Sequence, residues 1–196
     1  MALHFAVGPK AGESLVQQGI GRLASRKNPI AGMAVDFTTA RLQPPHAVYD
    51  LRADAVANGG ELAAASATGF RYLIEADGNN VGAAEVLVDQ AGAATVLANI
   101  NFGPYVDSTA RTLAALANTP AISAGSYEAR VLRFSAISLM ALWLKPDTGN
   151  ADIVVPLDPA PPGLQAGQQY SAADFLKAIQ PLAQKRAANK GPATVP

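Results

Sequence analysis

Three consecutive segments between Phe70 and Phe102 alternate apolar and polar residues with a period of two, which is the pattern of strands that bury one face. The segments cover residues 70–76, 81–89 and 94–102, and short turns rich in Asp, Asn and Gly separate them. Parallel neighbours would need long crossover connections, so these segments predict an antiparallel three-stranded meander. Even-numbered side chains such as Tyr72, Val86 and Val96 are predicted to point into the core.

Helices are predicted on both sides of the meander in the sequence. Residues 9–28 carry an apolar stripe at helical spacing, and a second helix is expected to end at Asn118, before Thr119-Pro120. The last helix has the clearest start, because Ser171 can cap it and Asp174 stands at the third capping-box position. Pro181 is expected to kink this helix or divide it.

Further strands are predicted at residues 127–134, 137–144 and 152–157. The segment 137–144 is apolar on both faces, so a buried helix fits its pattern as well as a strand does. Residues 127–144 fit either two strands or one strand with a bulge. Residues 30–69 hold no clear pattern, and their arrangement is left open.

This order of elements predicts an α+β fold, in which a curved antiparallel sheet carries helices on one face. The sheet would consist of the meander and two or three further strands. A doubly wound parallel fold is the alternative, but the strands do not alternate regularly with helices. We predict a single domain over residues 1–187 and a flexible tail over residues 188–196.

The composition narrows the classes of partner. Fifteen basic residues balance fifteen acidic ones, and the chain shows none of the basic stripes that nucleic-acid-binding proteins carry. Charged residues make up only 15 % of the chain, against about 25 % in an average globular protein. A surface with so little charge is poorly protected against association, so we expect a homo-oligomer or a protein partner.

The sequence also bears on location. Residues 1–12 hold no basic stretch followed by an apolar one, so no signal peptide is predicted. The longest apolar run, residues 136–144, is too short for a bilayer span of about 20 residues. We therefore expect a cytoplasmic protein that does not bind membranes.

No catalytic or metal-binding constellation is recognisable. The chain has no cysteine and two histidines, His4 and His46, and it lacks the Gly-x-Ser-x-Gly motif that presents a serine nucleophile. We therefore predict no metal site, no cofactor and no catalytic residue.

Five residues are candidates for ligand binding. Tyr72, Tyr127 and Trp143 would line a concave sheet that could hold a small ligand. Glu85 belongs to the polar face of the meander and would become desolvated if a second layer covered that face. Arg130 lies two residues after a glutamate on the same strand and could form an ion pair with it.

Two hypotheses about function follow. In the first, the protein is not an enzyme and acts through self-association or as a component of an assembly. In the second, it binds a small ligand, or is an enzyme, with a pocket between the sheet and its helices.

Overall fold

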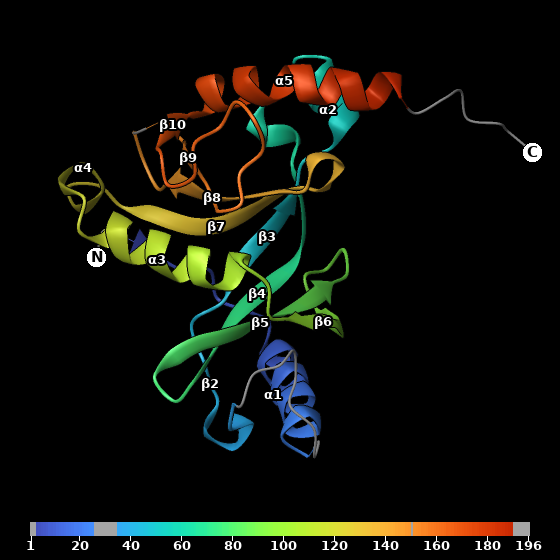
Figure 1. The fold of residues 1–196 in the computed structure, drawn as a ribbon, viewed down its shortest axis with the longest axis vertical. Coiled ribbons are helices and arrows are strands. Elements are labelled where there is room, and N and C mark those ends of the chain that lie inside the picture. Colours follow the sequence, from blue (N-terminus) through green and yellow to red (C-terminus); the bar gives the residue numbers. More distant parts are fainter. Residues whose placement is uncertain (1–2, 26–34, 150, 190–196) are drawn as a thin grey trace, which may run out of the picture.

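The computed structural model describes residues 3–25, 35–149 and 151–189, which form one sheet with helices packed against it (Figure 1). The strands are β1 (Leu3–His4), β2 (Arg41–Leu42), β3 (His46–Asp50), β4 (Ser66–Ala76), β5 (Asn79–Val88), β6 (Ala94–Asn101), β7 (Tyr127–Phe134), β8 (Leu139–Pro146), β9 (Ile153–Pro156) and β10 (Tyr170–Ser171). The helices are α1 (Lys10–Ala24), α2 (Ala53–Ala57), α3 (Tyr105–Ala117), α4 (Pro120–Ser123) and α5 (Ala172–Ala188). The short 3₁₀ turns are η1 (Phe37–Thr39), η2 (Leu62–Ala64) and η3 (Ser135–Ile137).

The sheet is open, and its strands follow the order β10-β9-β8-β7-β3-β4-β5-β6, with β1 paired to β7 and β2 paired to β4. The pairs β1–β7 and β3–β7 are parallel, and the other strand pairs are antiparallel. The predicted α+β class and the antiparallel sheet are therefore confirmed. The sheet has more strands than the sequence indicated, because several of them are only two to five residues long.

The meander is present as β4, β5 and β6, each antiparallel to the next. Tyr72 and Val86 are buried as predicted, but Val96 is 48 % exposed, so its predicted direction is wrong. Shifts in register between β5 and β6 at Glu85/Val86 and Leu87/Val88 explain the difference. They bring Leu97 opposite Val86, and Leu97 packs in the core in place of Val96.

Helices cover both faces of the sheet, whereas the sequence predicted that they cover one. Leu73 of β4 packs with Val106 of α3 on one face. Its neighbours Tyr72 and Ile74 point the opposite way and pack with Val16 of α1. A central strand can have apolar residues on both faces only if both faces are covered, and β4 meets this condition.

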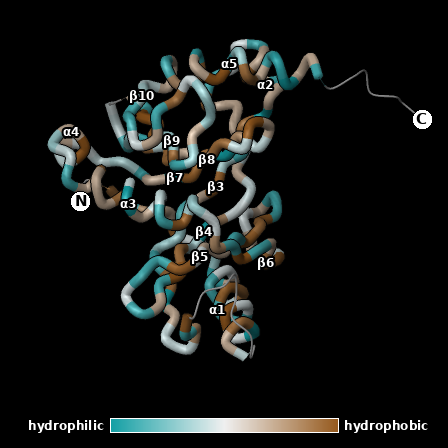
Figure 2. Tube along the Cα trace, in the orientation of Figure 1, coloured by the Kyte–Doolittle hydropathy of each residue, from teal (hydrophilic) through white to brown (hydrophobic). Residues whose placement is uncertain are grey.

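The β7–β8 half of the sheet is likewise covered on both faces. Trp143 and Phe134 pack with Phe175 of α5 and with α2, while Val131 and Leu142 point to the α3 and α4 side. Residues 127–144, for which two alternatives stood open, form two strands joined by η3. Figure 2 shows hydrophobic positions concentrated along the strands that cross the middle of the molecule.

The sequence left residues 30–69 open, and the structure places the joining strand of the sheet there. β3 pairs antiparallel with β4 and parallel with β7, so it connects the two halves of the sheet. Residues 26–34, which include the predicted end of the first helix at Asn28, lie outside the described residues.

The last helix begins as predicted, because the Ser171 side chain accepts a hydrogen bond from the backbone N–H of Asp174. Of the two predicted effects of Pro181, division of the helix is wrong, since α5 runs without interruption from Ala172 to Ala188. Pro181 is exposed, so the carbonyl that loses its helical partner lies on the side of the helix that water reaches. Of the predicted flexible tail, residues 190–196 lie outside the described residues.

The close contact between Gly69 of β4 and Val86 of β5 leads to a prediction about stability. A Cβ atom at Gly69 would overlap the backbone carbonyl oxygen of Val86, so Gly69→Ala should lower the free energy of unfolding by about 2 kcal/mol. Gly21→Ala is the control, because nothing lies within 4 Å of a Cβ there and α1 should gain about 1 kcal/mol. Urea unfolding of both variants measures the difference, and a Gly69→Ala protein as stable as the wild type would contradict the close packing.

Candidate functional site

The structure separates three of the five predicted ligand-binding residues from one another. Tyr72 is in the core beneath α1, and burial raises the pKa of its hydroxyl. Tyr127 is buried with Ile122 of α4 on the α3 side of the sheet. Glu85 is 5 % exposed and forms ion pairs with Arg71 and Arg133. None of these three residues is among those that line the two cavities described below.

The other two predicted residues, Arg130 and Trp143, lie side by side on the face of the sheet that α5 covers. They are directly opposite each other on β7 and β8. The Arg130 guanidinium carbon lies 5.0 Å from the centre of the Trp143 ring and 4.8 Å from the centre of the Tyr49 ring. The two rings meet edge to face, with their centres 5.2 Å apart. A cation over two aromatic rings is held by their negative faces.

Glu128 fixes the orientation of the guanidinium. The Arg130 Nε donates to Glu128 Oε1 at 2.8 Å, and Nη2 donates to Oε2 at 3.2 Å. Burial lowers the pKa of Arg130, but the bond to Glu128 and the nearby acidic groups outweigh this effect and raise the pKa overall. Arg130 is therefore a permanent cation whose Nη1 donors have no partner among the described side chains.

A cavity of about 560 Å³ lies beside this arrangement, and we call it the aromatic cavity. Tyr49, Trp143 and Arg130 line it from the sheet, η2 lines a second side, and Ala172, Ala173 and Leu176 of α5 line a third. Its volume is within the range of small-molecule sites, about 300–1,000 Å³.

The charges that line the aromatic cavity are balanced. Lys145 donates to the Asp152 carboxylate at 3.0 and 3.3 Å, and its Nζ lies 5.9 Å from the centre of the Trp143 ring. With Arg130 and Glu61, the lining holds two cations and two carboxylates. A phosphate dianion would find no surplus of positive charge there, whereas a ligand with one charge of each sign would match both pairs of groups.

Two residue sets that line the aromatic cavity carry hydrogen-bond donors without a protein acceptor in the described part of the chain, the start of α5 and Trp143. The first-turn N–H groups of a helix have no acceptor within that helix, and Ala172 and Ala173 bring this end of α5 to the aromatic cavity. The Trp143 indole N–H is buried and has no hydrogen-bond partner within the described ranges. The start of α5 therefore favours an acceptor group on a ligand, such as a carboxylate, whereas the indole N–H is closed to a ligand in this structure.

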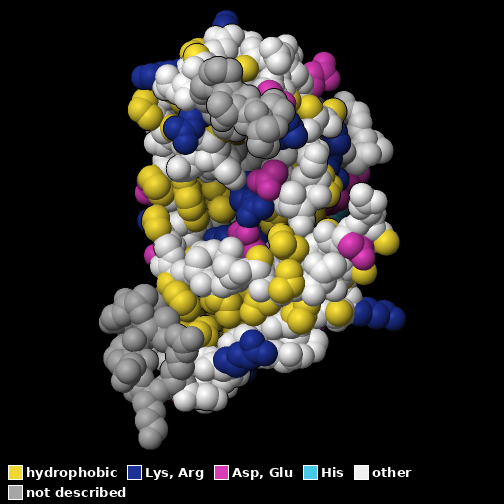
Figure 3. Space-filling view, turned by 90° about the vertical axis from the view of Figure 1, so that its right-hand side faces the viewer, with side chains coloured by type: hydrophobic (Ala, Val, Ile, Leu, Met, Phe, Trp, Pro, Cys, Tyr) yellow, Lys and Arg dark blue, Asp and Glu magenta, His cyan; other side chains and the backbone are white. Residues whose placement is uncertain are grey.

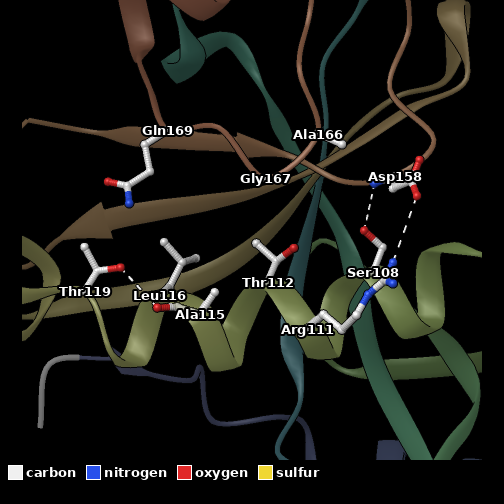
Figure 4. Close-up of a pocket in the computed structure, with 10 residues that line it drawn as sticks. All are labelled: Ser108, Arg111, Thr112, Ala115, Leu116, Thr119, Asp158, Ala166, Gly167 and Gln169. Carbon is white, nitrogen blue, oxygen red and sulfur yellow. Dashed lines mark hydrogen bonds and ion pairs between the residues drawn. The ribbon is translucent and has the colours of Figure 1, made fainter.

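A second cavity, of about 430 Å³, lies between α3 and the loop that follows β9 (Figure 4). Ser108 Oγ accepts a hydrogen bond from the backbone N–H of Asp158 at 2.7 Å, and Arg111 lies 4.0 Å from the Asp158 carboxylate. Ser108 thus holds the loop in place, and no histidine is among the drawn residues. We interpret this second cavity as a structural junction between the loop and α3.

Sequence reasoning found Arg130 and Trp143 but missed the other residues of the aromatic cavity. Tyr49 lies in the stretch that showed no clear pattern. Lys145 and Asp152 stand at the two ends of a turn, and pairing of the strands on either side would have brought them together. Glu61 and α5 reach the cavity only through tertiary packing.

No protein-family profile, curated protein or solved structure matches this chain. Within residues 3–25, 35–149 and 151–189, no helix is both long enough and apolar enough to cross a membrane. The same residues contain no group of three or more His, Cys, Asp or Glu side chains that could hold a metal ion. The case for a function therefore depends on the geometry described above.

Proposed function

We propose that this protein binds a small zwitterionic ligand with an apolar body, such as a free amino acid, in the aromatic cavity. The observation that carries the proposal is the Arg130 guanidinium, which Glu128 holds over the Tyr49 and Trp143 rings at the wall of a cavity of ligand size. Side chains locked in this way bind with little loss of conformational entropy.

The ligand class is inferred from the lining. A carboxylate would be bound by Arg130, by Lys145 and by the N–H groups at the start of α5. An ammonium group would be bound by Glu61 or Asp152. The apolar body would pack on alanine and leucine side chains of η2 and α5.

The residues that line the aromatic cavity favour a binding protein over an enzyme. No serine, histidine or cysteine is among the described residues that line the aromatic cavity. Of its carboxylates, Asp152 is paired with Lys145 and Glu61 is exposed to water, so neither is both unpaired and desolvated, as a general acid or base usually is. We therefore assign these groups to recognition of the ligand.

Arg130→Met should weaken binding by about tenfold or more, because it removes a charged donor worth about 1.5–3 kcal/mol and keeps the apolar stem. Trp143 is the only tryptophan in the chain, so its fluorescence reports directly on the aromatic cavity. The probe is L-leucine, compared with 4-methylpentanoate, which lacks the ammonium group, and 3-methylbutylamine, which lacks the carboxylate. Leucine should shift the emission at lower concentrations than either analogue.

The control is Arg52→Met, since Arg52 is an exposed arginine paired with Asp54 outside the aromatic cavity. This variant should bind leucine as the wild type does. Equal binding by the Arg130→Met protein, or equal binding of leucine and its two analogues, would contradict the proposal.

Self-association is a second candidate function, and one specific observation favours it. β6 ends the sheet with an uncharged edge, and the chain as a whole has no net charge and few charged residues. The two candidates involve different parts of the molecule and do not exclude each other.

A further inference from the structure

β6 is the open edge of the sheet. It is the last strand in the order, and it pairs with β5 on one side. Among the described residues, no strand is paired with its other side. Every second residue of such a strand points its backbone N–H and C=O groups outward, where they can pair with another strand.

Proteins usually protect such edges, and β6 lacks several of the common devices, although two register shifts interrupt its pairing with β5. Edge strands are commonly very short, or carry lysine or proline, which discourage pairing with another chain. The strand Ala94–Asn101 is eight residues long and contains no charged residue and no proline. By contrast, β10 at the other end has two residues and leads directly into α5.

The sheet surface next to this edge is apolar. Val96 of β6 is 48 % exposed, and Leu87, directly opposite on β5, is 38 % exposed. Figure 3 looks onto the side of the molecule where β6 lies, and hydrophobic side chains form a band across the lower half of that face. The charged side chains at the centre of this face lie above the band.

A second copy of this chain is the occupant that this edge fits best. Two β6 strands related by a two-fold axis run antiparallel, so each copy offers the other the same backbone groups and the same patch around Val96. Because Ala94–Asn101 carries no charge, two copies meet without electrostatic repulsion. A partner of different sequence would have no comparable symmetry in its favour.

We propose that two copies of the protein pair through antiparallel β6 strands and form one continuous sheet across a two-fold axis. This inference gives a specific form to the self-association named above and rests on it. It is independent of the aromatic cavity, which lies on the β7–β8 half of the sheet.

Val96→Lys should raise the dimer dissociation constant by about tenfold or more, because the symmetry axis brings two like charges together at the new interface. Val7→Lys is a matched control, since Val7 is 95 % exposed and lies outside the sheet. Light scattering coupled to size exclusion, over a range of concentrations, measures the mass of each protein. The wild type and Val7→Lys should be dimers under conditions where Val96→Lys is a monomer.

A single cysteine tests the geometry, because the chain has none of its own. Separate variants Thr95→Cys, Val96→Cys and Ala98→Cys sample exposed positions of β6, and at least one should form a disulfide-linked dimer under mild oxidation, whereas Val7→Cys should not. A wild type that is a monomer at every concentration would overturn both self-association and this interface. A dimer that survives Val96→Lys would overturn the β6 interface alone and leave self-association standing.

Discussion

Replacing Glu85 by Gln is expected to lower the free energy of unfolding by about 3–5 kcal/mol, the usual cost of removing one partner from a buried ion pair. Arg71 is 1 % exposed, and its Nη1 donates to Glu85 Oε1 at 2.8 Å. Arg133 donates to the other oxygen of Glu85 and also to Asp50. Glu85 is therefore the principal counter-charge of Arg71, whose own pKa is lowered by burial.

The loss should be seen in urea unfolding as a lower midpoint with an unchanged slope. Asp54→Asn serves as the control, because it breaks an ion pair with Arg52 that lies in water and should cause little change. The double variant Arg71→Met/Glu85→Leu should recover most of the loss, since apolar residues can replace a buried ion pair without cost. Stability of the Glu85→Gln protein within about 1 kcal/mol of the wild type would show that the pair is hydrated, as surface ion pairs are.

Acidification is expected to destabilise the protein through His46. This side chain is 1 % exposed, and burial lowers its pKa to about 4, with the nearby backbone of Arg71 opposing this shift and the charge of Arg71 adding to it. The ring nitrogens of His46 have no hydrogen-bond partner within the described ranges, and its ring packs edge to face on Phe5 at 4.9 Å. The imidazole is therefore neutral in the folded protein at pH 7.

The direction of the effect follows from proton binding. Below the ordinary histidine pKa of about 6.5, the unfolded chain binds a proton at His46 and the folded protein does not. The free energy of unfolding should therefore fall by about 3 kcal/mol as the pH drops from about 6.5 to about 4. Above pH 7 this contribution should not change.

His46→Leu removes the titrating group and keeps the position apolar, so this part of the pH dependence should disappear. Unfolding curves at several pH values measure it as the difference between the wild type and the variant, which cancels the titration of other groups. His4→Gln, at the exposed histidine that pairs with Asp147, should retain the fall. An identical pH dependence in the wild type and in His46→Leu would contradict the assignment.

The site could be predicted only in part. Arg130 was a candidate because it could pair with the glutamate two residues before it, and Trp143 because it could line a concave sheet, and the structure brings these two together. Tyr72 and Tyr127 were expected to line the same sheet and Glu85 to lie on its polar face, but the three lie in other places. A strand pattern tells which residues share a face, but not which helix covers that face.

The sequence alone determined the type and order of most elements. The three segments from Phe70 to Phe102, the strand from Tyr127 and the helix after Ser171 appear in the structure within a few residues of their predicted ends. These features depend on local physics, since periodicity, turn residues and caps act over a few positions.

Only the tertiary structure decided the long-range arrangement. The parallel pairing of β3 with β7, the helices on both faces and the exposure of Val96 arise from contacts between segments far apart in the chain. The same is true of the aromatic cavity, where residues from β3, β7, β8 and α5 meet. Local sequence patterns do not reveal these contacts, because the free energy of each contact depends on which surfaces the whole chain brings together.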